Sequence, residues 1–255
     1  MDSPKIYNKT VIINSRDVDG AGQCKASALL GYLQDASAEH TAVCGCGRKE
    51  MVERYNVFWM LTRIQVELIK PIHWLDQLTI RTGHRGGKGI LLYRDYELLV
   101  EGREVGYACA LWVLSDLDTR KLLNVSQTPI PELSDFVGGL EPKIRKLTAL
   151  HPPKEMTLAE VRTMRYSDTD VNGHVNNTKY ADFACDVMEL ERRQSNCFLS
   201  GLEITYHQEC QPGEQIQISR ATTQQGCFVH GEGFDQTARF DVKITLDIET
   251  EENGK

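Results

Sequence analysis

Residues 16–23 of the chain read RDVDGAGQ and residues 167–174 read SDTDVNGH, so two aspartates and a glycine recur at the same spacing. The similarity continues downstream, where residues 59–68 resemble residues 197–206. The offset between the copies falls from 151 residues at the turn to 138 at the strand, which leaves 13 extra residues in the first copy. These matches predict a fold built from two copies of one repeat.

Each copy is predicted to contain one main helix followed by an antiparallel meander. Apolar residues recur at helical spacing after each polar turn, as at Leu29 and Leu33 in the first copy and at Tyr180 and Phe183 in the second. Runs that alternate apolar and polar residues follow, separated by turns that contain glycine or proline. These runs are residues 61–69, 76–82, 90–100 and 104–115 in the first copy and 201–207, 214–221, 226–234 and 238–248 in the second. The pattern predicts an α+β protein in which each sheet covers its own helix.

The repeat also predicts domain boundaries. The first copy is expected to span residues 1–130 and the second residues 161–255, with a linker at residues 131–160. The linker is rich in proline and carries mixed charge without a clean period. Residues 248–255 are polar, and we expect this tail to fray.

The composition argues against several classes of protein. No apolar run approaches the roughly 18 residues of a membrane span, and the first residues do not resemble a secretion signal, so we expect a cytoplasmic protein. The eight cysteines are then expected to be reduced, and without paired CxxC motifs they do not indicate a metal site. A net charge of -7 argues against a surface that binds nucleic acid. An acidic partner would have to dock on a local basic patch.

The first candidate for chemistry is residues 170–180 (DVNGHVNNTKY), which place a carboxylate, an imidazole and several amides just before a helix. His174 can transfer protons near neutral pH, and Asp170 and Asn172 can orient a neighbour or a water molecule. The N–H groups at the helix start favour a developing oxyanion. The alternative is that the glycine makes an ordinary turn and one of the following asparagines caps the helix.

The first copy lacks the groups that could do this chemistry. It has Ala21 and Gln23 where the second copy has Asn172 and His174. The shared turn therefore does not require the amide and the imidazole, and we expect chemistry in the second copy only.

The second candidate is residues 206–213 (YHQECQPG) at the end of a predicted strand, whose first-copy counterpart at residues 70–72 has no carboxylate or thiol. Glu209 could act as a general base on water, whereas Cys210 could be a thiolate nucleophile paired with His174. Adjacent residues on a strand point to opposite faces, so we expect only one of them to act. Strict alternation would point Cys210 inward, but the nearby Pro-Gly turn leaves the choice open.

These motifs resemble those of the plant and bacterial acyl-acyl-carrier-protein thioesterases, which are double hot-dog proteins. The resemblance rests on residues 170–180, residues 206–210 and the helical region 27–34, and it covers nearly the whole chain. One departure is Phe183, where that family usually has a tryptophan. The resemblance implies two tandem hot-dog repeats, each an antiparallel sheet wrapped around one principal helix. It also implies hydrolysis of fatty acyl groups from acyl carrier protein, which ends chain elongation and needs no metal or cofactor.

The resemblance further implies a set of catalytic residues. Asp170, Asn172, His174 and Glu209 form the expected set, with Cys210 as a second candidate for the reacting group. In the expected mechanism Glu209 draws a proton from a water molecule that attacks the thioester carbonyl. His174 and Asn172 position the water and the carbonyl, and Asp170 orients its neighbours.

Two sets of binding residues follow from the same reading. The first copy is expected to shape the acyl pocket, with Trp59, Met60 and Trp112 either lining it or belonging to the ordinary core. Cations in and after the linker are expected to form a docking patch for acyl carrier protein, or else a solvated surface. They are Lys143, Arg145, Lys146, Lys154, Arg162, Arg165 and Lys179.

Other functions remain open at the level of sequence. The runner-up is an acyl-CoA thioesterase, because the reacting bond is the same. A non-catalytic acyl-binding or dehydratase-like hot-dog protein is a third reading, since a fold does not fix a function. A homodimer is one candidate assembly, although two fused repeats already make a pseudo-dimer.

Overall fold

The computed structural model divides the chain into two compact units, and neither is one continuous segment. Unit 1 consists of residues 1–12, 31–66 and 76–147, and unit 2 of residues 13–30, 67–75 and 148–255. The structure describes residues 4–127, 130, 133, 137–194 and 196–249. Both copies of the repeated turn belong to unit 2. The predicted boundaries at residues 130 and 161 stay a prediction about the repeats, because the compact units interleave along the chain.

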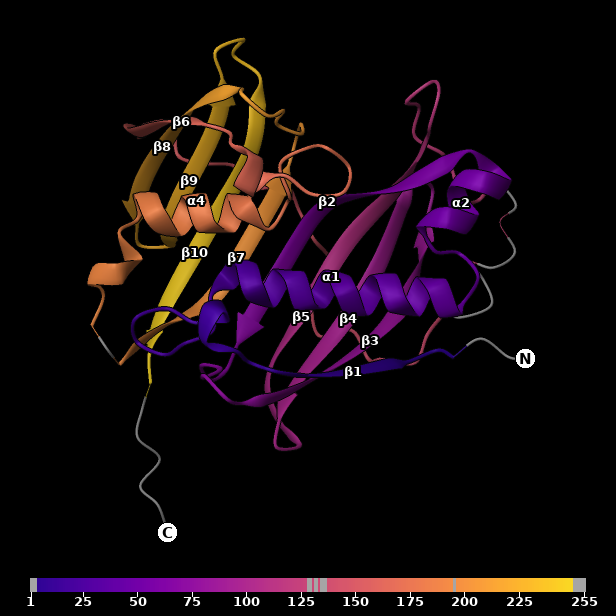
Figure 1. The fold of residues 1–255 in the computed structure, drawn as a ribbon, viewed down its shortest axis with the longest axis horizontal. Coiled ribbons are helices and arrows are strands. Elements are labelled where there is room, and N and C mark those ends of the chain that lie inside the picture. The colour runs from indigo at the N-terminus through magenta and orange to yellow at the C-terminus, as the bar shows by residue number, and fades with distance from the viewer. Residues whose placement is uncertain (1–3, 128–129, 131–132, 134–136, 195, 250–255) are drawn as a thin grey trace. The chain divides into compact units, whose positions relative to one another are not determined.

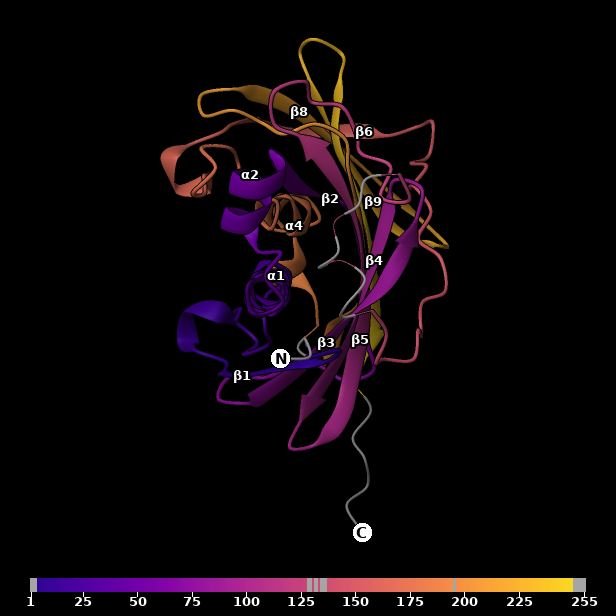
Figure 2. The same cartoon turned by 90° about the vertical axis from the view of Figure 1, so that its right-hand side faces the viewer.

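The strands of unit 1 form an antiparallel arrangement in the order β1-β3-β4-β5-β2. The helix α1 lies across one face of β3, β4 and β5, as Figure 1 and the turned view in Figure 2 show. The elements are β1 (Tyr7–Ile12), α1 (Ala26–Val43), α2 (Arg48–Tyr55), β2 (Val57–Leu68), β3 (Gln77–Lys88), β4 (Leu91–Val100) and β5 (Arg103–Asp116).

The core of unit 1 follows from the period of each element. Leu78 and Ile80 are two residues apart on β3 and therefore point to the same face, where both are fully buried. Leu98 on β4 and Leu33 on α1 are also fully buried. Burying such side chains is the main source of stability for a sheet covered by a helix.

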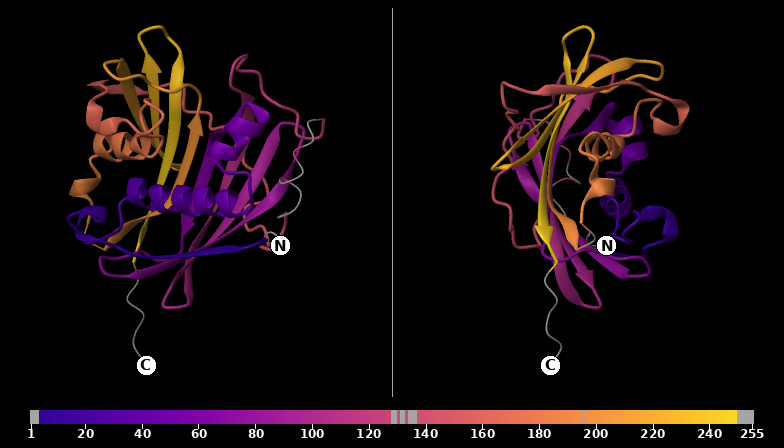
Figure 3. Two further views of the ribbon diagram at one scale, coloured as in Figure 1. Left: turned by 45° about the vertical axis from the view of Figure 1, so that its right-hand side comes forward. Right: turned by 90° about the vertical axis from the view of Figure 1, so that its left-hand side faces the viewer.

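Unit 2 repeats this plan with fewer helical residues. Its strand order is β7-β10-β9-β8-β6, and α4 lies against the strands, as Figure 3 shows. The elements are β6 (Thr157–Thr163), the short 3₁₀ helix η2 (Tyr166–Asp168), α4 (Lys179–Val187), η3 (Leu190–Arg192), β7 (Cys197–Tyr206), β8 (Gln215–Thr223), β9 (Gly226–Gly233) and β10 (Ala238–Ile248). The Tyr180 ring on α4 packs against the Phe240 ring on β10, with 4.8 Å between the ring centroids, and both residues are buried.

The strand prediction is confirmed, because each of the eight predicted runs corresponds to one strand from β2 to β5 or from β7 to β10. The sequence did not predict β1, α2 or β6, and the first residues of β6 lie in the predicted linker. Residues 131–132 and 134–136 of that linker lie outside the described residues, as do residues 250–255 of the predicted fraying tail.

Candidate active site

The repeated turn has the same backbone geometry in both copies. The N–H of Gly22 donates to the Asp19 carbonyl at 3.0 Å, and the N–H of Gly173 donates to the Asp170 carbonyl at 3.0 Å. The two glycines have φ of 76° and 77°, which favours glycine at this position. The shared sequence motif therefore encodes one turn, made twice.

In the second copy, Asp170 holds this turn through its carboxylate. Its Oδ1 accepts a hydrogen bond from the backbone N–H of Asn172 at 2.8 Å, and its Oδ2 lies 3.5 Å from the amide nitrogen of the same residue. The backbone N–H of Asp170 donates to the His174 carbonyl at 3.0 Å. Asp170 thus fixes the turn that presents Asn172 and His174.

His174 lies beside Glu209, although 35 positions separate them in the sequence. The distance from His174 Nδ1 to Glu209 Oε2 is 3.1 Å. The backbone brings them together, because the N–H of Val175 donates to the Cys210 carbonyl at 3.0 Å. The His174 and Glu209 side chains are 29% and 46% exposed, so water can reach both. An imidazole and a carboxylate in contact with water can exchange protons with it.

Cys210 lies in a different environment from its neighbour Glu209. It is fully buried. Burial raises the pKa of the thiol to about 11, so the thiol is protonated near neutral pH. Since the thiolate is the nucleophilic form, this environment does not favour nucleophilic catalysis by Cys210.

One of the asparagines in the segment forms a local side-chain turn just before α4. The side-chain oxygen of Asn176 accepts a hydrogen bond from the backbone N–H of Thr178 at 3.0 Å, immediately before α4. The N-cap of α4 is Thr178, whose side chain makes no capping hydrogen bond, so the predicted asparagine cap is not observed. Asn172 is exposed on the turn.

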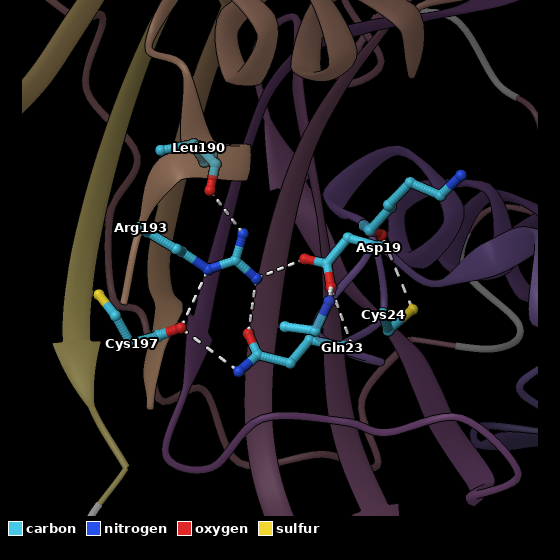
Figure 4. A network of polar contacts seen from close by, with 8 residues as sticks. Asp19, Gln23, Cys24, Leu190, Arg193 and Cys197 are labelled. Carbon is cyan, nitrogen blue, oxygen red and sulfur yellow. Dashed lines mark hydrogen bonds and ion pairs between the residues drawn. The ribbon is translucent and has the colours of Figure 1, made fainter. Parts of the chain in front are cut away.

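The turn of the first copy is contacted by Arg193, which belongs to the second copy. Its Nη2 contacts a carboxylate oxygen of Asp19 and donates to Gln23 Oε1 at 2.9 Å (Figure 4). Gln23 Nε2 in turn lies 3.3 Å from the Cys197 carbonyl, to which Arg193 Nε also donates at 3.0 Å. Asp19 and Gln23 correspond to Asp170 and His174, so this copy of the turn binds a guanidinium of the protein itself.

The predicted acyl-pocket residues do not all meet. The rings of Trp59 and Trp112 lie edge to face with centroids 6.3 Å apart. They pack against a buried cluster of unit 1 that includes Met51 and Leu114. Met60 is exposed and, as the next residue along β2, points to the opposite face from Trp59. The structure thus brings together the two tryptophans but not Met60.

The predicted docking cations divide into two groups. Lys143 pairs with Glu104, Arg162 pairs with Glu160 and Asp186, and Lys179 pairs with Asp182. In the part of the chain that the structure describes, the other four make no ion pair and are exposed. These four are Arg145, Lys146, Lys154 and Arg165.

Among residues 4–127, 130, 133, 137–194 and 196–249, no group of three or more His, Cys, Asp or Glu side chains could hold a metal ion. Within the same ranges no helix combines the length and the apolar character needed to cross a membrane.

Comparison with protein families matches both halves of the chain. Residues 4–132 match the acyl-ACP thioesterase N-terminal domain, and residues 151–253 match the acyl-ACP thioesterase C-terminal domain. The chain belongs to the acyl-ACP thioesterase family. The predicted family is therefore confirmed.

Curated relatives in the acyl-ACP thioesterase family are distant and longer. The chloroplastic palmitoyl-acyl carrier protein thioesterase of Arabidopsis thaliana is 25% identical over 239 residues, which cover 87% of this chain and 56% of the relative. An oleoyl-acyl carrier protein thioesterase of the same plant is 24% identical, with 85% and 64% of the two chains covered. The chain spans between half and two thirds of the length of these relatives.

Solved structures of acyl-ACP thioesterases share the fold. A thioesterase from Bacteroides thetaiotaomicron superposes with a TM-score of 0.83 at 20% identity, covering 95% of this chain and 98% of that one. The 12:0-ACP thioesterase from Umbellularia californica gives 0.77 at 18% identity, covering 96% and 98%. The predicted α+β double hot-dog class is confirmed.

The sequence missed two residues that the structure places beside the repeated turns. Arg193 contacts the turn of the first copy, and the Tyr180 hydroxyl contacts the backbone of Cys210. Tyr180 ends the motif at residues 170–180, and the alignment of the repeats pairs it with Leu29. This difference between the copies could have identified it. No local pattern marked Arg193.

Proposed function

We propose that the protein hydrolyses the thioester that joins a fatty acyl group to acyl carrier protein, releasing free fatty acid and ending chain elongation. Family membership supports the reaction, and curated relatives named for palmitoyl- and oleoyl-acyl carrier protein support the substrate class. The observation that carries the proposal is the contact of His174 with Glu209 at 3.1 Å, in the one copy that has both groups.

Glu209 is the proposed general base. It takes a proton from water as the water oxygen forms a bond to the thioester carbonyl carbon. When the tetrahedral intermediate collapses, the C–S bond breaks, and the departing sulfur of the carrier takes up a proton. The products are one carboxylic acid and one thiol. A thioester is already activated, so positioning and a modest base suffice.

The neighbouring groups have positioning roles in this proposal. His174 contacts the base and orients the attacking water. Asn172 is presented beside it by the Asp170 carboxylate, which accepts from the Asn172 backbone at 2.8 Å. The expected oxyanion role of the N–H groups at the start of α4 gains no support, because the N–H groups of Thr178 and Lys179 already donate to Asn176.

The proposal assigns acyl binding to residues 1–130 and catalysis to residues 161–255. The edge-to-face pair of Trp59 and Trp112 supports an apolar role for the first copy, because aromatic rings offer large apolar surfaces. Met60 is exposed, and this observation gives it less support as a lining residue.

We also propose a cytoplasmic location, with a homodimer as one candidate assembly. The eight cysteines all lie among the described residues and form no disulfide there, which suits a reducing compartment. Light scattering on the purified protein would give a mass of one chain or of two, and only the latter supports the homodimer.

The test of the proposed function compares matched substrates. Purified protein should release fatty acid from acyl carrier protein faster than from acyl-CoA with the same chain, and His174→Ala should lose about 10²-fold or more in kcat. His151→Ala, which changes an exposed histidine, is the matched control and should keep normal turnover. Faster turnover of acyl-CoA would favour the alternative thioesterase. Release of no fatty acid from either substrate would indicate a binding protein.

A further inference from the structure

Both polar backbone groups of Cys210 are held, and Cys210 is the residue that directly follows the proposed base. Its carbonyl accepts from the N–H of Val175 at 3.0 Å, and its N–H donates to the hydroxyl oxygen of Tyr180 at 3.1 Å. Val175 directly follows His174. The peptide of Cys210 therefore connects the segment that carries Glu209 to the segment that carries His174.

The first copy has a counterpart of the backbone bond between Val175 and Cys210 but none of the Tyr180 hydroxyl. The N–H of Cys24 donates to the Ile72 carbonyl at 2.7 Å, which repeats the bond from Val175 to Cys210. The residue that corresponds to Tyr180 is Leu29, which is buried and has no hydroxyl. The fold can thus make the turn and its backbone bond without this hydroxyl, which is present only in the copy with the imidazole and the carboxylate.

The Tyr180 hydroxyl is a fixed anchor. Tyr180 is 3% exposed, and its ring packs on Phe240, Phe183 and Tyr206 with centroid distances of 4.8, 5.9 and 5.9 Å. Burial raises the pKa of its hydroxyl, which therefore stays neutral at any working pH. Because the packed ring fixes the position of this oxygen, the N–H of Cys210 that donates to it is fixed as well.

We propose that Tyr180 is a positioning residue that sets the Glu209 carboxylate against His174 by holding the N–H of Cys210. The inference rests on the proposed function, in which Glu209 is the base. It also gives Cys210 a role other than that of a nucleophile, because the backbone of Cys210 links the segment of Glu209 to that of His174. An enzyme whose base is displaced by a fraction of an ångström still binds substrate but reacts more slowly. Loss of the Tyr180 hydroxyl should therefore lower kcat and leave KM nearly unchanged.

The test uses a pair of conservative substitutions. Tyr180→Phe keeps the ring and removes the hydroxyl, and should lower kcat about tenfold or more while KM stays within about twofold. Tyr206→Phe is the matched control: its ring contacts that of Tyr180, and within the described residues its buried hydroxyl has no hydrogen-bond partner. Its kcat should stay within about twofold of the parent.

A double substitution separates positioning from a general structural effect. If Tyr180 acts through Glu209, adding Tyr180→Phe to Glu209→Gln should cost no further activity. An equal loss in both backgrounds, or a Tyr180→Phe enzyme with normal kcat, would overturn the inference while leaving the proposed base in place. Normal turnover by Glu209→Gln alone would remove the base, and the inference with it.

Discussion

Glu209 and Cys210 are neighbours in the chain, but their side chains meet different surroundings. The Glu209 side chain is 46% exposed and lies 3.1 Å from His174, whereas Cys210 is fully buried. A carboxylate in contact with water can accept a proton and pass it on. A thiol whose pKa burial raises to about 11 is almost entirely protonated at pH 7. The chemistry of the site therefore favours Glu209.

Substitution at these two positions should give opposite results. Glu209→Gln keeps the shape and removes the basicity, so kcat should fall about 10²-fold or more. Cys210→Ser keeps the backbone bonds and a similar volume, so turnover should stay within a few-fold of the parent. Steady-state kinetics on acyl carrier protein substrate would measure both. An acyl group trapped on Cys210, with near-normal turnover by Glu209→Gln, would reverse the assignment.

The pH dependence of the rate gives a second distinction. If the Cys210 thiolate attacked, kcat/KM would rise about tenfold per pH unit from pH 7 to pH 10, because the thiolate fraction rises until the pKa of about 11. If Glu209 acts as the base on water, no buried thiol has to lose its proton, and we expect no such rise. A profile measured at pH 7, 8 and 9 suffices, and a hundredfold increase would count against Glu209.

The sequence predicted the members of this site but not the choice between them. The repeat comparison singled out His174 and the segment around Glu209, since the first copy lacks both groups. Alternation along a strand could not assign Glu209 and Cys210, because β7 ends at Tyr206, before either residue. Burial in the folded structure distinguishes them.

At the scale of elements, the turn of the first copy has become a structural contact. Arg193, which follows η3, contacts Asp19 and donates to Gln23, the two counterparts of Asp170 and His174. It also donates to the Leu190 carbonyl at 3.0 Å, and its side chain is only 13% exposed. A largely buried guanidinium with several acceptors should contribute to stability, because removing it leaves a carboxylate unpaired.

Removal of this guanidinium should therefore destabilise the protein. Arg193→Met keeps the apolar length of the side chain and should lower the free energy of unfolding by about 2–3 kcal/mol. Arg192→Met is the matched control, because Arg192 is 73% exposed and, among the described residues, pairs only with the neighbouring Glu189 and Glu191. It should change stability by less than about 0.5 kcal/mol. Denaturant unfolding of both variants would measure the difference, and equal values would show that the Arg193 contacts are not stabilising.

The elements themselves were largely predictable, but this contact was not. The turn has a local signature of aspartates and glycine, so its second occurrence could be read from the sequence. Arg193 and Gln23 are 170 positions apart, and one arginine carries no pattern that names its partner. The strands β1 and β6 were missed for the related reason that their short runs carry little alternation of their own.

At the scale of the whole molecule, the repeat predicted the fold class but not the compact units. Two copies of one helix and one meander correctly indicated an α+β protein, and the family resemblance correctly implied the double hot-dog fold. The segments 13–30 and 67–75 of the first copy group with residues 148–255, so the turn of the first copy belongs to unit 2. This grouping depends on long-range packing and leaves no mark in composition or period.

The charge of the whole molecule also constrains how it meets its proposed partner. With a net charge of -7, the protein repels anions at long range, so an acidic carrier needs a local basic patch. Three of the seven cations predicted for this patch already pair with carboxylates of the protein, so they are less available to a partner. The four that make no ion pair among the described residues are the better candidates, namely Arg145, Lys146, Lys154 and Arg165.

Charge reversal of these four residues to glutamate should raise KM for the carrier-bound substrate and leave kcat nearly unchanged. The matched control reverses four other exposed cations, Arg48, Lys49, Arg103 and Lys121, and so gives the same net charge without altering the patch. We expect the patch variant to raise KM several-fold more than the control at low salt. The difference should shrink near 0.5 M salt, where the screening length falls to a few ångströms. Equal KM values for the two variants at low salt would show that only net charge matters and that these four cations do not form the docking site.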